Sequence, residues 1–218
     1  MNVFVSWSGG KESSLALYKA LKEGLKVGYL FTMLNEDGLR SRGHGLRKEV
    51  IEAQAKAIQI PIIYGKATWD SYEDEFKRVI RDLKNRGIEG GVFGDLDFQE
   101  NRDWVEKVCS EVGLQVYEPL WKQKYEIVLA EFMDRGFEAI IVSAKSDLID
   151  SNWIGHPLNW DFIEFLRRRK IDLCGENGEY HTLVTNGPIF KRHLKILESR
   201  ELEKTDRWLL DILKSDII

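Results

Sequence analysis

Short apolar runs rich in β-branched and aromatic residues alternate along the chain with longer stretches whose apolar residues recur at helical spacing. Leu15, Tyr18 and Leu21 mark a helix that follows the first apolar run and ends near Gly24. The same alternation predicts strands at residues 3–7, 27–34, 62–64, 91–94 and 115–117, and further helices at residues 47–58, 72–83 and 105–112. Strands and helices of these lengths form right-handed βαβ units, so the first half predicts a parallel sheet covered on both faces.

The pattern changes at Pro119, and we place a domain boundary close to it. Beyond it the spacing predicts helices at residues 125–135 and 159–169, strands at 139–143 and 181–185, and a terminal hairpin from residues 194–199 and 208–213. We therefore expect two units, residues 1–120 and residues 121–218. The predicted fold class is α/β, a Rossmann-like parallel sheet followed by a smaller α/β domain at the C-terminus.

The composition is that of a folded globular protein. The 218 residues are 43% hydrophobic and 31% charged and include 4 prolines, which excludes disordered and collagen-like chains. A net charge of −4 disfavours an extensive nucleic-acid surface, and no apolar run reaches the roughly 20 residues of a membrane span. Cys109 and Cys174 are far apart and form no CxxC pair, so we expect a cytoplasmic protein with two free thiols and no membrane partner.

Residues 8–14, of sequence SGGKESS, lie between the first predicted strand and the first predicted helix. The adjacent Gly9 and Gly10 allow backbone conformations in which several N–H groups converge on one anion. The helix that follows adds unpaired N–H donors and a partial positive charge, and Lys11 adds a full charge. The segment therefore predicts a phosphate or pyrophosphate site, the alternative being an ordinary Ser/Gly turn with a helix cap.

This segment differs from two common nucleotide-binding loops. The P-loop of nucleoside triphosphatases would need glycine in place of Val5 and serine or threonine in place of Glu12. The dinucleotide fingerprint needs three spaced glycines, whereas Gly9 and Gly10 are adjacent and the third is missing. The segment nevertheless occupies the first turn of a parallel sheet, where ligands bind at the carboxyl ends of the strands.

Residues 8–13, SGGKES, resemble the SGGKDS signature of the N-type ATP pyrophosphatases, also called PP-loop enzymes. The resemblance implies an adenine nucleotide α-hydrolase fold, with the outer phosphates of ATP on the loop and cleavage between the α- and β-phosphates. Glu12 replaces the usual aspartate and keeps the carboxylate on a longer side chain. The implied ATP-binding residues are Ser8, Gly9, Gly10, Lys11, Ser13, Ser14, Thr32, Met33, His44 and Gly94, with a buried core methionine as the alternative for Met33.

Three further segments narrow the resemblance. Gly94-Asp95, Glu118-Pro119-Leu120-Trp121 and the run GENGEYHT at residues 175–182 are similar to the diphthine–ammonia ligase family, as are His44 and Gln54. The family implies an amide ligase that adenylates a carboxylate, releases pyrophosphate and lets ammonia displace AMP, with Mg²⁺ neutralising the pyrophosphate. Its acceptor is a carboxylate on a modified histidine, diphthine, of translation elongation factor 2. ATP, Mg²⁺, ammonia and this factor are thus the implied ligands, and the oligomeric state, including a homodimer, stays open.

The resemblance also suggests roles for individual side chains. Lys11, Glu12 and Asp95 are the implied catalytic residues, with Asp95 holding Mg²⁺ or a ribose; capping of the next helix is the alternative for Asp95. We expect Trp121 to close the seam between the two halves. The implied substrate-side residues are Trp121, Glu176, Gly178, Glu179, His181 and Thr182. An exposed acidic turn is the alternative for the glutamates, and a histidine at a strand edge for His181.

Two departures from the family pattern concern the acceptor side. The family's late segment resembles GEGGExET, whereas this chain has Asn177 for a glycine and His181 for an acidic residue. This change removes a negative charge, so an unknown carboxylate is an alternative acceptor. Two other functions stay open: a tRNA-modifying PP-loop enzyme, which the missing CxxC pairs and the acidic balance disfavour, and an ATP-binding module without chemistry.

Overall fold

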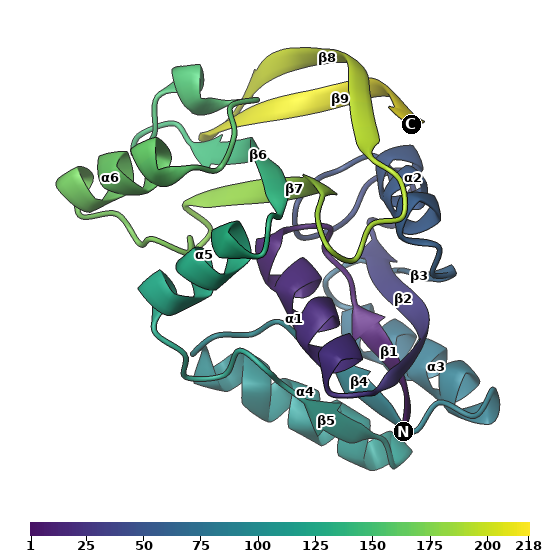
Figure 1. Cartoon of the computed structure of the whole chain (residues 1–218). Helices are drawn as coiled ribbons and strands as arrows, with labels where there is room; N and C mark the ends of the chain where they lie inside the picture. Colours follow the sequence, from purple (N-terminus) through teal and green to yellow (C-terminus); the bar gives the residue numbers. More distant parts are fainter.

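The computed structural model describes all residues from Met1 to Ile218 and contains two sheets (Figure 1). The first sheet has five parallel strands in the order β3-β2-β1-β4-β5. Its elements are β1 (Asn2–Ser6), α1 (Lys11–Lys22), β2 (Lys26–Leu34), α2 (Lys48–Ile58), β3 (Ile62–Lys66), α3 (Tyr72–Asn85), β4 (Gly90–Val92), α4 (Gln99–Val112) and β5 (Gln115–Tyr117). The predicted parallel α/β architecture of this half is confirmed.

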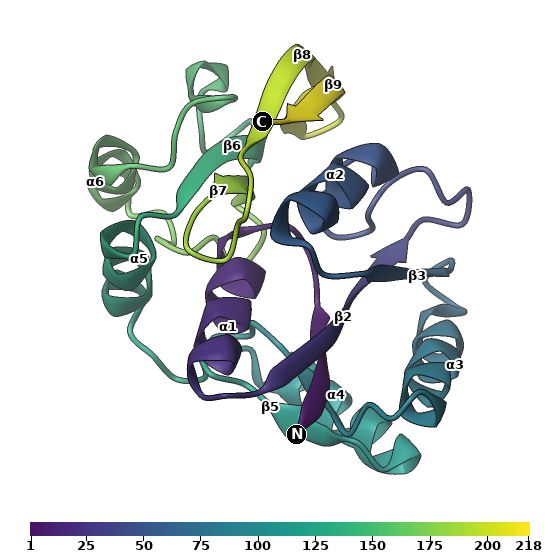
Figure 2. The ribbon, with the colours of Figure 1, turned by 45° about the vertical axis from the view of Figure 1, so that its right-hand side comes forward.

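Strand β1 separates two hydrophobic layers, because successive side chains of a strand point to opposite faces. Val3 and Val5 join the layer that contains α1 and α2, whereas Phe4 joins the layer that contains α3 and α4. The Phe4 ring packs edge-on against Phe31 and Phe93, with centroids 5.9 and 5.7 Å away. Figure 2 shows α1 and α3 on opposite sides of these strands. Helices therefore cover both faces, as a parallel sheet requires.

The strand order places the loop between β1 and α1, residues 7–10, beside the end of β4. Strand β1 lies at the centre of the sheet, between β2 and β4. Strands β2 and β3 follow on one side of it, and β4 and β5 on the other. Connections diverge at such a point and leave an opening at the carboxyl ends of the strands. Gly94, just after β4, is so close to α1 that an added Cβ would stand 2.9 Å from the backbone carbon of Glu12.

The second sheet is antiparallel, in the order β7-β6-β9-β8. Its half of the chain contains α5 (Tyr125–Asp134), β6 (Glu138–Lys145), the short 3₁₀ helix η1 (Ser151–Trp153), α6 (Trp160–Arg169), β7 (Tyr180–Asn186), β8 (Leu194–Lys204) and β9 (Arg207–Ile217). The predicted smaller C-terminal α/β part is confirmed, and its terminal hairpin has strands of 11 residues each, longer than the sequence pattern indicated. None of the helices combines the length and apolar character that crossing a membrane would require.

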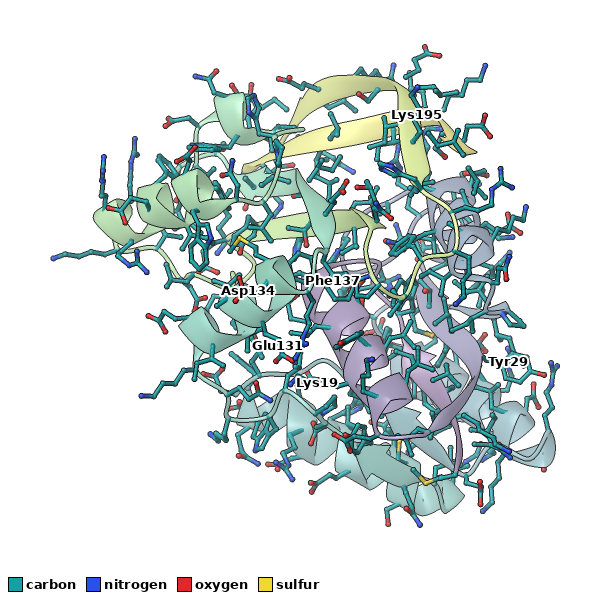
Figure 3. All side chains as sticks on the ribbon, in the orientation of Figure 1. Lys19, Tyr29, Glu131, Asp134, Phe137 and Lys195 are labelled. Atoms are coloured by element: carbon teal, nitrogen blue, oxygen red, sulfur yellow. The ribbon has the colours of Figure 1, made fainter.

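Helix α1 lies between the two sheets and contacts strands of both (Figures 1 and 2). One hydrophobic cluster of 37 buried residues spans both halves. Lys19 of α1 pairs with Glu131 of α5 at 2.7 Å, and Figure 3 shows these side chains directed towards each other. Asp211 of β9 accepts hydrogen bonds from Arg40 and Arg47 of the first half, each at 2.7 Å. The division at residue 120 stays a prediction, since the core is continuous across it.

Candidate active site

The loop between β1 and α1 is shaped by its own hydroxyl groups. Gly9 has a φ of +82°, in the left-handed region that favours glycine. Ser8 Oγ accepts from Gly10 N–H at 3.2 Å and lies 3.1 Å from Ser13 Oγ, which donates to the Gly10 carbonyl at 3.1 Å. The backbone N–H groups of Ser8, Gly9, Glu12 and Ser13 have no acceptor within the protein. Four unpaired amides at a helix N-terminus are a ready donor set for an anion.

Close neighbours require glycine on two sides of this loop. A Cβ at Gly10 would lie 2.5 Å from His44 Cε1, and a Cβ at Gly94 would lie 3.1 Å from Glu12 Cβ and nearer still to its backbone. The loop is therefore enclosed by the His44 segment on one side and by the end of β4 on the other. This places Gly94 and His44 beside the loop, and their roles in ATP binding stay predictions.

The side chain of Lys11 points into the seam between the two halves. Its ammonium lies 2.6 Å from Glu12 Oε1, donates to the Cys174 carbonyl at 2.5 Å and lies 4.4 Å from the centre of the Tyr180 ring. Burial alone would lower the pKa of Lys11, but the Glu12 carboxylate and the polar groups around it raise that pKa above its ordinary value. In this arrangement the positive charge of Lys11 is neutralised inside the protein by Glu12. A contact between Lys11 and a phosphate stays a prediction.

A cavity of about 180 Å³, here called the Thr32 cavity, opens beside the loop at the carboxyl ends of β1 and β2. Four of its 13 lining residues are predicted ATP-binding residues: Ser8, Thr32, Met33 and His44. The other lining residues, among them Arg42 and Trp69, were not predicted as site residues. The Arg42 guanidinium lies 4.6 Å from the centre of the Trp69 ring, which is 72% exposed. Aromatic and apolar walls beside a few polar groups suit a planar heterocycle.

A second cavity of about 310 Å³, here called the Glu176 cavity, lies at the ends of β4 and β7. Burial, and after it the Glu12 charge, raise the pKa of Glu176 to about 8. Burial also raises the pKa of Asp95, and Glu12 adds to that shift. Seven predicted site residues line this cavity: Glu12, His44, Gly94, Asp95, Glu176, Gly178 and His181. Three carboxyl groups that disfavour one another's charge favour a cationic ligand there.

His44 lines both cavities and stacks on His181, with ring centroids 4.4 Å apart and planes at 24°. Its Nδ1 lies 3.1 Å from the Thr182 carbonyl; since a carbonyl only accepts, Nδ1 carries the proton. Burial, and after it the Lys11 charge, lower the pKa of His44 to about 4. Burial also lowers the pKa of His181 well below its ordinary value, as do His44 and Arg207. Both imidazoles are therefore neutral at pH 7.

Two predicted site residues, Thr182 and Ser14, are buried and line neither cavity. Thr182, expected on the substrate side, is fully buried, and its Oγ1 accepts from the Lys11 N–H at 3.1 Å. It thereby connects β7 to the start of α1. Ser14 is also fully buried, and its hydroxyl has no hydrogen-bond partner.

Two other predicted substrate-side residues lie away from both cavities. The Glu179 carboxylate accepts from the Asn177 N–H at 3.0 Å and closes its own turn. The Trp121 ring lies 4.7 Å from the Arg102 guanidinium of α4, so it packs on the first half of the chain. The structure therefore brings Glu176 and His181, but not Glu179 or Trp121, into the candidate site.

Sequence analysis assigned no role to Gln54 or Arg207. Gln54 is fully buried on α2. The sequence feature that could have identified it is a polar side chain on the apolar face of a predicted helix. Arg207 donates from Nη1 to the Gly178 carbonyl at 2.8 Å and from Nε to Ser143 Oγ at 2.9 Å. It stands at the start of β9, and no local pattern placed it beside the Glu176 cavity.

The residues present fit the phosphates of ATP through the four unpaired amides of the loop. Fewer groups are available for Mg²⁺, because the protein has no cluster of three or more His, Cys, Asp or Glu side chains that could hold a metal ion. Magnesium is commonly bound by one or two carboxylates together with phosphate oxygens. Asp95 lines the Glu176 cavity beside Glu12, and its role as the Mg²⁺ ligand stays a prediction.

Comparisons with known proteins identify relatives over most of the chain. Residues 1–116 match the family described as Diphthamide synthase N-terminal domain, and residues 124–218 match Diphthamide synthase C-terminal domain. The diphthine–ammonia ligase of Bos taurus is 26% identical over 93% of this chain and 85% of its own length; that of Homo sapiens is 25% identical over the same shares. The enzyme of Schizosaccharomyces pombe is 26% identical over 93% of this chain but only 37% of its own length.

One solved structure, titled as a predicted subunit of tRNA methyltransferase from Methanocaldococcus jannaschii, has a TM-score of 0.47 and 15% identity. It covers 86% of this chain and 98% of its own. A likeness of this size carries no functional conclusion.

Proposed function

The chain belongs to the diphthamide synthase family, and from that premise we propose that it is an ATP-dependent amide ligase that adenylates a carboxylate and transfers the acyl group to ammonia. The observation that carries the proposal is a loop with four unpaired amides that is flanked by two cavities, both lined by His44. We assign the adenine to the Thr32 cavity, the outer phosphates to the loop and the acceptor to the Glu176 cavity.

The proposed reaction makes a poor electrophile reactive. A carboxylate resists attack by ammonia because oxide would have to leave. In the first step a carboxylate oxygen attacks the α-phosphorus, the bond from that phosphorus to the α–β bridging oxygen breaks, and pyrophosphate leaves. In the second step ammonia attacks the acyl carbon and loses a proton, and AMP leaves with the former carboxylate oxygen.

The chain contributes position and charge to these steps. The loop amides donate to the departing pyrophosphate, and fixed donors of this kind stabilise charge that develops during reaction. Bound Mg²⁺ would neutralise part of the same charge. The ammonium of Lys11 fixes Glu12 and the Cys174 carbonyl and so holds the start of α1 in place.

The acidic walls of the Glu176 cavity support a particular acceptor. Glu12, Asp95 and Glu176 favour a cation, which agrees with ammonium and with a carboxylate carried on a cationic histidine derivative. We therefore propose elongation factor 2 carrying diphthine as the acceptor. His181 replaces an acidic residue of the family pattern, and an unknown carboxylate is the alternative.

An isotope experiment tests the proposed chemistry. The purified protein is incubated with ATP, Mg²⁺, ammonium and diphthine-bearing elongation factor 2 whose carboxylate is labelled with ¹⁸O. Adenylation is expected to give AMP and pyrophosphate, with one ¹⁸O atom transferred to AMP, and an amide on the acceptor.

Other outcomes decide against the proposal. ADP with ¹⁸O in orthophosphate would indicate carboxyl phosphorylation instead. ATP that binds but stays intact with this acceptor and with a panel of small carboxylates would leave a nucleotide-binding module. AMP release that depends on tRNA rather than on a carboxylate would indicate a tRNA-modifying enzyme.

A further inference from the structure

The side chain of Gln54 uses all of its hydrogen-bonding groups to join three segments. Its Oε1 accepts from the Trp7 indole N–H at 2.8 Å. Its Nε2 donates to the Gly9 carbonyl at 3.0 Å and to the Val184 carbonyl at 2.7 Å. Since the group is fully buried, each lost bond would leave a polar atom without water to replace its partner.

These bonds fix the orientation of one peptide group of the loop. The Gly9 carbonyl accepts from Gln54 and also from the Val184 N–H at 2.9 Å. A trans peptide is planar, so a fixed carbonyl directs the following Gly10 N–H to the opposite side, into the loop, where it donates to Ser8 Oγ. The Gly9–Gly10 peptide can therefore flip only by breaking these two hydrogen bonds, and its fixed orientation determines the course of the loop on either side of it.

Strand β7 holds both ends of the same turn. Val184 bonds to Gly9, and Thr182 Oγ1 accepts from the Lys11 N–H. Gln54 is the only side chain that joins the loop, the end of β1 and β7 at once. It lines neither the Thr32 cavity nor the Glu176 cavity, so it can act on a ligand only through the groups it bonds: the loop, and Trp7, which lines the Thr32 cavity.

We propose that Gln54 is a positioning residue that holds the loop amides in the conformation that binds the outer phosphates of ATP. The inference rests on the proposed function, because it assumes that a triphosphate occupies the loop. It makes a specific claim about selectivity: Gln54 contributes more to the affinity for the outer phosphates than to the affinity for the adenosine part.

The test compares nucleotides on the full chain by calorimetry. Gln54→Met keeps the length of the side chain and removes all three bonds. We expect its affinity for ATP to fall by about tenfold or more, as displaced binding groups commonly cause, while its affinity for AMP stays within about threefold of wild type. Gln123→Met is the matched control, because Gln123 also donates to a backbone carbonyl, that of Pro119 at 2.6 Å, away from the loop.

A second variant keeps the inference testable if Gln54→Met folds poorly. Gln54→Glu preserves the shape and the acceptor for Trp7, but an ionised carboxylate cannot donate to Gly9 or Val184. When protonated it regains one donor, so its ATP affinity relative to wild type at the same pH should recover as the pH falls. Gln54→Met should show no such recovery.

The outcomes separate this inference from the proposed function. Equal losses for ATP and AMP, or no loss for either, would overturn the positioning role while leaving the ligase proposal intact. Failure of the wild-type protein to bind ATP at all would overturn the proposed function and this inference with it. The indole ¹H–¹⁵N resonance of Trp7 gives an independent readout, since its downfield shift should disappear in Gln54→Met.

Discussion

The ammonium group of Lys11 and the backbone carbonyl of Cys174 are joined by a hydrogen bond of 2.5 Å although 163 residues separate them in the chain. Lys11 is the first residue of α1, and Cys174 belongs to the turn before β7. The bond therefore ties the end of the loop between β1 and α1 to the wall of the Glu176 cavity. The proposed nucleotide side and the proposed acceptor side of the candidate site meet at this contact.

Replacing Lys11 should affect stability as well as ligand binding. Lys11→Met leaves the Glu12 carboxylate, whose side chain is 17% exposed, without its cation, and breaking a largely buried pair costs about 3 kcal/mol of unfolding free energy. Urea denaturation of wild type, Lys11→Met and the double variant Lys11→Met/Glu12→Gln measures this. We expect the double variant to regain most of the loss. Wild-type stability in Lys11→Met, with only ATP affinity reduced, would instead identify Lys11 as a direct phosphate ligand.

Gly94 should tolerate no side chain. In Gly94→Ala the new Cβ would stand 2.9 Å from the backbone of Glu12, so the start of α1 must move and the loop amides with it. We expect ATP affinity to fall by about tenfold or more, measured by calorimetry. Gly28→Ala is the control: its Cβ would meet the flexible end of Ile88 at 3.1 Å, far from the loop, and its ATP affinity should match wild type. Unchanged affinity in Gly94→Ala would show that the loop adapts.

The parallel half of the fold was predictable because its information is local. Continuous apolar runs mark the buried strands, glycines mark the helix ends, and the Gly9-Gly10 pair indicates the phosphate loop. The direction of the Lys11 side chain was not predictable, because two of the three groups it contacts, the Cys174 carbonyl and the Tyr180 ring, lie far from it in the sequence. The Trp69 wall and the antiparallel order of the second sheet likewise depend on contacts between segments that no local spacing encodes.

Glu176 should make the protein less stable as the pH rises. Its pKa is raised to about 8 in the folded protein, above the ordinary value of 4.5, so the native state holds a proton that the unfolded state releases. Stability attached to this group is present below about pH 4.5 and is lost as the pH rises through about 8. Glu176→Gln keeps the shape without the charge.

We therefore expect the Tm of Glu176→Gln, without nucleotide, to exceed that of wild type by about 2–4 °C near pH 8.5 and to equal it near pH 4. Thermal unfolding followed by circular dichroism at both pH values measures the difference. Glu179→Gln is the comparison, because that carboxylate accepts from the Asn177 N–H in its own turn and its loss should not stabilise the protein. Equal Tm values for wild type and Glu176→Gln at high pH would show that Glu176 is ionised without penalty.

Asp211 should hold the terminal hairpin to the first half of the chain in a pH-dependent way. Hydrogen bonds from Arg47 and from Arg40 lower the pKa of this fully buried carboxyl group well below its usual range, although burial alone would raise that pKa. A carboxylate with a depressed pKa contributes stability above its ordinary pKa of about 4 and loses that contribution as the pH falls. Asp211→Asn removes the charge that the arginines share.

Asp211→Asn is expected to lower the unfolding free energy by about 2 kcal/mol near pH 7, because Arg40 and Arg47, each about one-third exposed, lose the charged acceptor of their hydrogen bonds. The difference from wild type should shrink as the pH falls below about 4, since the unfolded wild-type chain then takes up a proton at Asp211 that the native state does not yet bind. Urea denaturation across this range measures both effects. Asp216→Asn, an exposed position on the same strand, should change neither. A deficit in Asp211→Asn that stays constant with pH would mean that hydrogen-bond geometry, and not the charge, secures the hairpin.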